Sequence, residues 1–187
     1  MIKRLLDVIG ALLCLIIFSV PLILVALAVK LTSKGPILHW SERIGIYGIP
    51  FYMPKFRSMR VDTPQVATSL LLNPHEFLTP IGSFIRKTSL DELPQLWSIL
   101  KGDLSFVGPR PALYNEHEWL DLRQLKGIDQ IRPGLTGWAQ VNGRDSLSTL
   151  EKVKFEEEYL KRQSLAFDLY IIWLTFIKVV RREGISH

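Results

Sequence analysis

The chain has 187 residues with a formal charge of +5, and 48% of them are hydrophobic, which suits one domain with or without a membrane element. The basic charge favours anionic partners such as phosphates or acidic lipid headgroups. Nucleic acid is not expected, because the cations are interspersed with acidic residues and form no stripe. The single cysteine, Cys14, excludes an intrachain disulfide and gives no indication of an oxidising compartment.

The N-terminal segment, residues 1–34, is strongly apolar. It carries no charge from Val8 to Val29. As one straight helix this run would extend about 33 Å, enough to cross a hydrocarbon core. Three interpretations compete: a signal peptide, a single spanning helix, and a helix that bends back within the membrane. The run is longer than the hydrophobic region of a usual signal peptide, which disfavours the first.

Two features favour the bent helix. Pro21 lies in the middle of the run and removes a hydrogen bond to the carbonyl of Ile17, and Ser19 can bond back one turn earlier and ease a bend. Lysines and arginines flank the run on both sides, so the positive-inside tendency draws both ends to the cytoplasm. We expect residues 1–34 to form a re-entrant membrane helix and residues 35–187 to form a compact domain on the cytoplasmic face.

Residues 35–60 change to a period of two. Two short aromatic and β-branched segments, residues 36–40 and 50–56, are separated by Gly45 and Gly48. This pattern predicts a small β-hairpin. Lys55 alternates with Phe56 and so lies on one face of its strand.

An adjacent carboxylate pair, Asp91 and Glu92, follows at what the pattern predicts to be the start of a helix that ends near Gly102. Ser89 and Glu92 fit a capping box, and by themselves the two carboxylates are most simply explained as helix caps. Several cations lie close in sequence, however: Arg86 precedes the pair, and Arg110 follows it between two prolines that would fix its backbone. Carboxylates among cations can bind a divalent metal and attack or orient a phosphoryl group.

The C-terminal part is predicted to be mainly helical around one glycine-rich segment. Residues 112–125 have an amphipathic helical pattern, and residues 148–163 are expected to form a charged helix with a solvated face. The composition of residues 168–182 fits either a helix lying in a membrane interface or a core helix. Between them, residues 132–144 combine glycines with side-chain donors, a composition that a plain loop shares: Arg132, Gln140, Asn142 and Arg144.

The chain also resembles a known family, the monotopic phosphoglycosyl transferases, or bacterial sugar transferases. The resemblance rests on four motifs in the order in which the family has them: residues 55–59 (KFRSM), 89–95 (SLDELPQ), 100–111 (LKGDLSFVGPRP) and 132–144 (RPGLTGWAQVNGR). It implies a mainly α fold with a small β-hairpin, in which a re-entrant helix and interfacial amphipathic helices surround a catalytic domain. One departure is Val20, which separates a serine and a proline that are usually adjacent in the family.

The resemblance further implies an enzyme of the bacterial inner membrane that transfers a sugar 1-phosphate from a UDP-sugar to polyprenol phosphate, with UMP released. Asp91 would be the nucleophile, and Asp91 and Glu92 would hold Mg²⁺. The phosphates and nucleotide would lie against basic and amide side chains: Lys55, Arg86, Arg110, Arg132, Gln140, Asn142 and Arg144. A lipid glycosyltransferase that releases UDP, and a non-catalytic membrane adaptor, are alternatives. The sequence leaves open the sugar, the pathway, the role of Glu92 and whether the chain forms a homo-oligomer.

Overall fold

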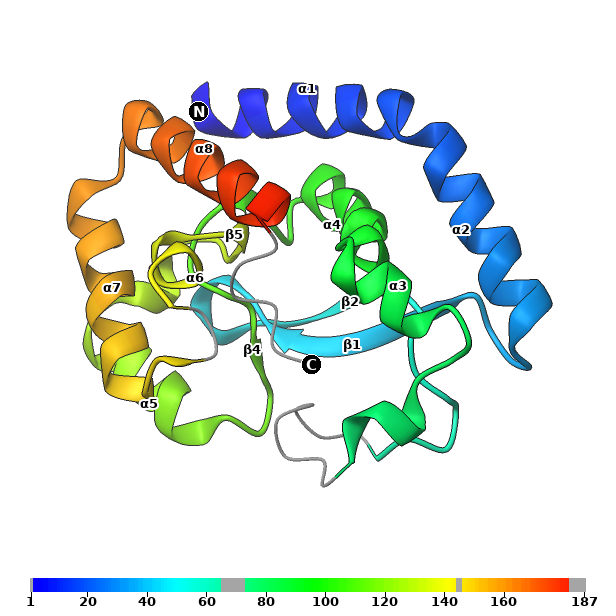
Figure 1. The fold of residues 1–187 in the computed structure, drawn as a ribbon. Coiled ribbons are helices and arrows are strands. Elements are labelled where there is room, and N and C mark those ends of the chain that lie inside the picture. Colours follow the sequence, from blue (N-terminus) through cyan, green and yellow to red (C-terminus); the bar gives the residue numbers. More distant parts are fainter. Residues whose placement is uncertain (1, 65–72, 144–145, 182–187) are drawn as a thin grey trace.

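The computed structural model describes residues 2–64, 73–143 and 146–181 (Figure 1). The α-helices in these ranges are Ile2–Ile17 (α1), Ser19–Thr32 (α2), Gly82–Lys87 (α3), Leu96–Lys101 (α4), His117–Leu125 (α5), Trp138–Val141 (α6), Thr149–Arg162 (α7) and Leu165–Arg181 (α8). The strands are Leu38–Ile44 (β1), Pro50–Phe56 (β2), Ser105–Val107 (β3), Ala112–Leu113 (β4) and Gly134–Thr136 (β5). Short 3₁₀ helices are Ile46–Gly48 (η1), Pro74–Phe77 (η3), Leu90–Gln95 (η4) and Ile128–Gln130 (η5). The fold is thus mostly helical with a small sheet, as predicted.

The N-terminal apolar segment is bent. α1 and α2 meet at an angle of 64° across Phe18 (Figure 1). The break lies next to Ile17, which is four positions before Pro21. The proline ring is expected to clash with the backbone carbonyl of Ile17. Within the described residues the Ser19 hydroxyl makes no hydrogen bond, so the bend is explained by the proline alone. Among the described helices none is long and apolar enough to cross a membrane by itself, whereas the bent pair together has that length and composition.

The predicted hairpin is confirmed, and additional strands join it. β1 and β2 are antiparallel, with His39 opposite Lys55 and Arg43 opposite Phe51. β4 adds to the other edge of β1, and β3 pairs in parallel with β5. The predicted helix over residues 112–125 is therefore wrong at its start: Ala112 is fully buried against β1, and α5 begins only at His117.

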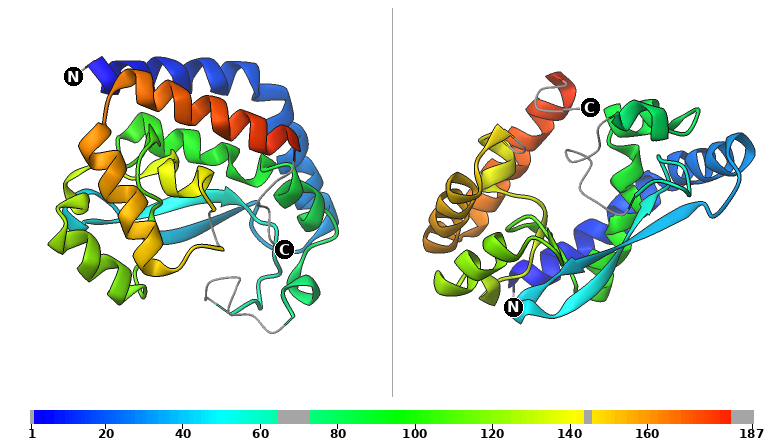
Figure 2. Two further views of the ribbon diagram at one scale, coloured as in Figure 1. Left: turned by 60° about the vertical axis from the view of Figure 1, so that its left-hand side comes forward. Right: turned by 90° about the horizontal axis from the view of Figure 1, so that it is seen from below.

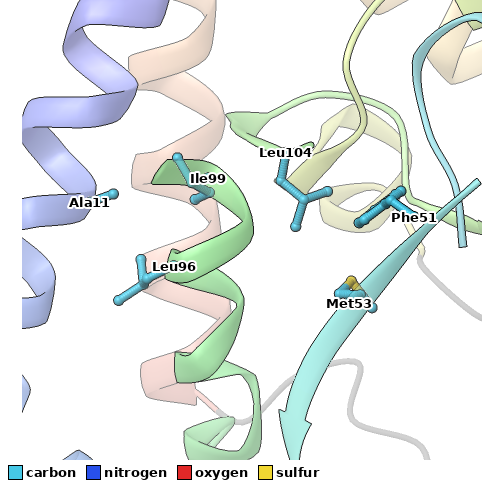
Figure 3. Close-up of a cluster of buried hydrophobic side chains, with 6 residues drawn as sticks. All are labelled: Ala11, Phe51, Met53, Leu96, Ile99 and Leu104. Atoms are coloured by element: carbon cyan, nitrogen blue, oxygen red, sulfur yellow. The ribbon is translucent and has the colours of Figure 1, made fainter. Parts of the chain in front are cut away.

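The main hydrophobic cluster joins the bent helix pair to the domain. α4 lies between α1 and β2, so that Ala11 on α1 and Met53 on β2 face opposite sides of it (Figure 3). Ile99 of α4 is fully buried there. Burying a side chain of this size contributes about 1.5–3 kcal/mol relative to exposure. α1 is therefore packed on one side and apolar on the other, where exposed residues include Leu5, Leu12, Leu13, Ile16 and Ile17.

α8, the orange-to-red helix in Figure 2, has two different faces. Phe167, Asp168 and Ile171 are buried against the domain, while the opposite face leaves large apolar side chains exposed: Leu169, Trp173, Phe176 and Val180. The buried face agrees with the core alternative for this helix, while the interfacial alternative stays a prediction for the exposed apolar face. Its buried end is fixed to α1, because the Lys3 ammonium lies 2.5 Å from the Asp168 carboxylate.

Candidate active site

The carboxylate pair lies on η4, and a left-handed residue sets its position. α3 ends at Lys87, and Ser89 has φ 55° and ψ 17°. The predicted capping box is wrong, because a capping serine needs an extended backbone, and the Ser89 side chain makes no cap bond. Its N–H donates instead to the Arg86 carbonyl at 3.1 Å. A short 3₁₀ turn then places Asp91 inward before α4 begins, and α4 ends at Gly102 as expected.

Asp91 is buried, with 9% of its surface exposed. Burial, followed by the nearby negative charge of Glu92, raises the pKa of Asp91 to about 6, while Lys55 and Arg86 act in the opposite direction. Within the described residues no other side chain donates a hydrogen bond to its carboxylate. With a pKa near 6, Asp91 is mostly ionised at neutral pH, and a backbone hydrogen bond is among the contacts that favour its charged form.

Glu92 has a definite partner. The Lys55 ammonium of β2 lies 2.8 Å from Glu92 Oε1, and each side chain is about one quarter exposed. This contact connects the hairpin to η4. Because His39 lies opposite Lys55 in the β1–β2 register, it borders the same site.

A second group of cations borders the pair. Arg43 on β1 donates from Nη1 to the Pro111 carbonyl at 3.2 Å. Burial and the adjacent Arg110 guanidinium lower the pKa of Arg43 to about 10, whereas Glu116 and Glu92 raise it. The charges of Arg110 and Glu92 are thus both close enough to Arg43 to change its pKa. Arg43 was not among the predicted site residues, although its same-face spacing from His39, which pairs with Lys55, is a signal that could have identified it.

The loop that carries Arg110 is pressed against the glycine-rich segment. A Cβ on Gly108 would lie 2.3 Å from the Arg132 carbonyl oxygen, and one on Gly137 would lie 2.0 Å from the Gly108 carbonyl oxygen. Gly134 has the same close relation to Gly108. These glycines are therefore explained by the contact between the two backbones, where any side chain would force them apart.

The remaining predicted binding residues occupy different environments. Gln140 and Arg110 line one small hollow, and Gln140 Oε1 is buried without a hydrogen-bond partner in the described residues. Arg132 donates from Nε to the Gly102 carbonyl at the end of α4, at 2.9 Å. Asn142 donates to the Trp138 carbonyl within its own short helix, at 2.7 Å. Arg144 lies outside the described residues.

A cavity elsewhere in the domain is a separate feature. It has a volume of about 210 Å³ and lies between the hairpin turn and α5, with Tyr47, Pro109 and Asp121 in its wall. Neither Asp91 nor Glu92 lines it. The carboxylate pair therefore lies apart from this cavity.

Asp91 and Glu92 were predicted from the sequence to hold Mg²⁺. Among the described residues, no three His, Cys, Asp or Glu side chains gather as a metal cluster. Mg²⁺ commonly uses only one or two carboxylates and takes its remaining ligands from water and substrate phosphates. Asp91 and Glu92, adjacent on η4, fit that kind of site.

The site also touches the apolar helix pair. Leu90, next to Asp91, packs against the cluster that contains Val25 and Val29 of α2. Fold and site together define a mainly helical domain in which a cation-flanked carboxylate pair lies beside a bent, apolar N-terminal helix pair.

Comparison with known proteins agrees with this description. The chain belongs to the bacterial sugar transferase family, whose sequence model matches residues 1–182. It is 43% identical over 188 residues to a UDP-glucose:undecaprenyl-phosphate glucose-1-phosphate transferase of Escherichia coli, covering 95% of this chain and 40% of that protein. It is 39% identical to an uncharacterised sugar transferase of Bacillus subtilis, covering 98% of this chain and 90% of that protein. It is also 38% identical to an undecaprenyl-phosphate galactose phosphotransferase of Salmonella typhimurium, covering 97% of this chain and 41% of that protein.

Proposed function

We propose that this chain is a phosphoglycosyl transferase that moves a sugar 1-phosphate from a UDP-sugar to a polyprenol phosphate, undecaprenyl phosphate in particular, and releases UMP. The observation that carries this proposal is the state of Asp91. It is a buried carboxylate to which no described side chain donates a hydrogen bond, set among Lys55 and Arg86 and one residue from the contact with α2. The names of the relatives from Escherichia coli and Salmonella typhimurium, which specify sugar-phosphate transfer to undecaprenyl phosphate, support the same assignment.

In the first step an Asp91 carboxylate oxygen attacks the β-phosphorus of the UDP-sugar. The bond from that phosphorus to the bridging oxygen breaks, and UMP leaves with the electron pair. The product is an aspartyl phosphosugar. The guanidinium groups of Arg43, Arg86 and Arg110 surround the site and would stabilise charge on the phosphoryl oxygens.

In the second step an oxygen of the polyprenol phosphate attacks the phosphorus of this intermediate. The Asp91–phosphorus bond breaks, the carboxylate is regenerated, and the lipid leaves as a diphosphate-linked sugar. Glu92 is oriented by Lys55. Both carboxylates would hold Mg²⁺, which when bound neutralises diphosphate charge.

The acceptor is a lipid, so the active site has to lie at a membrane surface. We propose that α1 and α2 enter one leaflet and return, and that the exposed apolar face of α8 rests in the interface beside α1. The catalytic domain would then lie on the cytoplasmic face of the bacterial inner membrane, where anionic headgroups meet its basic residues.

The nucleotide product tests the reaction class. Purified enzyme, Mg²⁺ and undecaprenyl phosphate are incubated with a panel of UDP-sugars, and the released nucleotide is separated by chromatography. We expect UMP in proportion to lipid-linked product. Release of UDP would identify simple sugar transfer, and no turnover with any donor would leave a non-catalytic adaptor.

Membrane topology is tested by labelling. In a variant with Cys14 replaced by Ser, single cysteines at Ile2 and at Lys34 should both resist an impermeant thiol reagent added to intact cells. Pro21→Leu restores the hydrogen bond and removes the clash with Ile17, and should shift part of the population to a spanning helix. Labelling of one site alone in the chain that retains Pro21 would contradict the re-entrant arrangement.

A further inference from the structure

We propose that the buried ion pair between Arg123 of α5 and Glu156 of α7 is a positioning device for Arg110. The sequence suggested a solvated face for the α7 charges, yet Glu156 is only 1% exposed and Arg123 only 6%. The inference rests on the proposed function, in which Arg110 holds phosphoryl oxygens.

The Arg123 guanidinium has two kinds of partner. Its Nε donates to Glu156 Oε2 at 2.8 Å, and its Nη2 donates to Glu156 Oε1. The same Nη2 donates to the Arg110 carbonyl oxygen at 2.7 Å. Trp119 donates its indole N–H to Glu156 Oε2 at 3.2 Å and lies under the guanidinium, whose Cζ is 4.2 Å from the ring centroid. Glu156 thereby fixes the direction in which Arg123 points at the loop.

The loop depends on such carbonyl contacts. Pro109 and Pro111 have no N–H, so the backbone beside Arg110 can be held mainly through its carbonyl oxygens. The backbone carbonyls of Pro109, Arg110 and Pro111 each accept a hydrogen bond from a different element. The Gly134 N–H donates to the Pro109 carbonyl at 2.8 Å, Arg123 donates to the Arg110 carbonyl, and Arg43 donates to the Pro111 carbonyl at 3.2 Å.

These three contacts fix three successive peptide planes. The proline rings restrict φ at positions 109 and 111, and the carbonyl contacts restrict the remaining torsions around Arg110. The backbone position from which the Arg110 side chain extends is thereby fixed before substrate binds. A packing role alone would not require this arrangement, because well-packed apolar residues often replace a buried ion pair without loss of stability.

The decisive variant removes the charges and keeps the packing. In the double substitution Arg123→Met with Glu156→Leu, we expect the thermal midpoint to change by only a few degrees. We expect kcat/KM to fall about 10- to 100-fold, the scale expected for a misplaced binding group. Hydrogen exchange in the peptide spanning residues 104–114 should accelerate, which reports loop order independently of activity. Arg123→Lys, which keeps the charge but loses the fork, should show the same loss of activity and serves if the double variant does not fold.

Leu160→Ala is the matched control. Leu160 lies one turn after Glu156 on α7 and packs in the same cluster as Trp119. It should lower the thermal midpoint, while kcat/KM per folded molecule and exchange in residues 104–114 stay near those of the unsubstituted chain. A control that lost activity in proportion to stability would reduce the ion pair to a structural role and overturn the proposal.

A cycle with Arg110→Ala distinguishes this inference from the proposed function. If the pair acts through Arg110, the double substitution should cost less than threefold in the Arg110→Ala background. Equal losses in both backgrounds would overturn the positioning role while leaving the proposed function intact. Near-normal turnover by Arg110→Ala would instead overturn the phosphate-binding role of Arg110.

Discussion

Two buried aspartates of this chain show how similar residues come to do different work. Asp168 of α8 is 6% exposed and Asp91 of η4 is 9% exposed. The Asp168 carboxylate receives the Lys3 ammonium at 2.5 Å and the Tyr159 hydroxyl at 2.7 Å, so both oxygens are occupied. Asp91 lies in the field of Lys55 and Arg86 without a side-chain donor among the described residues. Burial is therefore common to both, and the difference is that side chains donate to both oxygens of Asp168, whereas no described side chain donates to Asp91.

The largest expected effect is on turnover, and it should differ between substitutions of the two aspartates. Asp91→Asn should lower turnover by about four orders of magnitude, because an amide cannot act as the nucleophile. Asp168→Asn, the matched control, should keep turnover per folded molecule within about threefold. Both are measured as UMP release at equal folded concentration. Comparable losses in the two variants would mean that Asp91 is only another buried structural aspartate.

The next largest effect concerns the planar guanidinium group of Arg110. Arg110→Lys should lower kcat/KM about 10- to 100-fold although the charge is kept, because an ammonium cannot grip two phosphoryl oxygens as a planar fork does. The measurement is steady-state kinetics with UDP-sugar varied. Lys101→Arg, at an exposed ammonium that pairs with Asp103, serves as the control and should have no effect.

Acid should inactivate the enzyme through Asp91. With the pKa of Asp91 near 6, kcat/KM should fall about tenfold per pH unit below pH 6 and level off above it. Glu92 raises this pKa and Lys55 lowers it. The acid limb should therefore move to lower pH in Glu92→Gln and to higher pH in Lys55→Met. Shifts in the opposite directions would contradict the assignment of the limb to Asp91.

The smallest effects are in stability, and they have opposite signs at the two aspartates. The pKa of Asp91 is raised on folding from an ordinary 3.8 to about 6, so its ionised form disfavours the folded state. This penalty is absent below about pH 4, grows up to pH 6 and stays constant above, at up to about 3 kcal/mol. Asp91→Asn should thus be more stable at pH 7 and lose this advantage at pH 4. Asp168→Asn should be less stable by about 1–3 kcal/mol, because an NH₂ group replaces one of two oxygens that accept from Lys3 and Tyr159 and the negative charge is lost. Thermal unfolding at both pH values measures this.

Local chemistry made part of this structure predictable from sequence. Pro21 predicted the bend beside Ile17, alternation predicted the hairpin, and Gly102 predicted the end of α4. The proximity of Asp91, Glu92 and Arg86 followed from their closeness in sequence, whereas the contact of Glu92 with Lys55 depends on how β2 packs against η4.

The predictions failed where long-range contacts override local pattern. β3 and β5 are three residues each and pair across a long separation, and β4 forms only because Ala112 is buried against β1. The Ser89-Glu92 pattern fits a capping box, yet the left-handed backbone of Ser89 prevents it. Glu156 has a charged sequence neighbourhood and became buried because Arg123 and Trp119, on another helix, supply its partners.

The most direct test of this account is the mass of the enzyme after it meets donor substrate alone. Enzyme is mixed with UDP-sugar and Mg²⁺ without lipid acceptor, and then examined by intact-protein and peptide mass spectrometry. We expect about one UMP per active site and a mass increase of one phosphosugar on the peptide that contains Asp91. Both signals should be absent from Asp91→Asn and present, though slower, in Glu92→Gln. A normal adduct on the Asp91→Asn protein would place the covalent bond elsewhere and contradict the account.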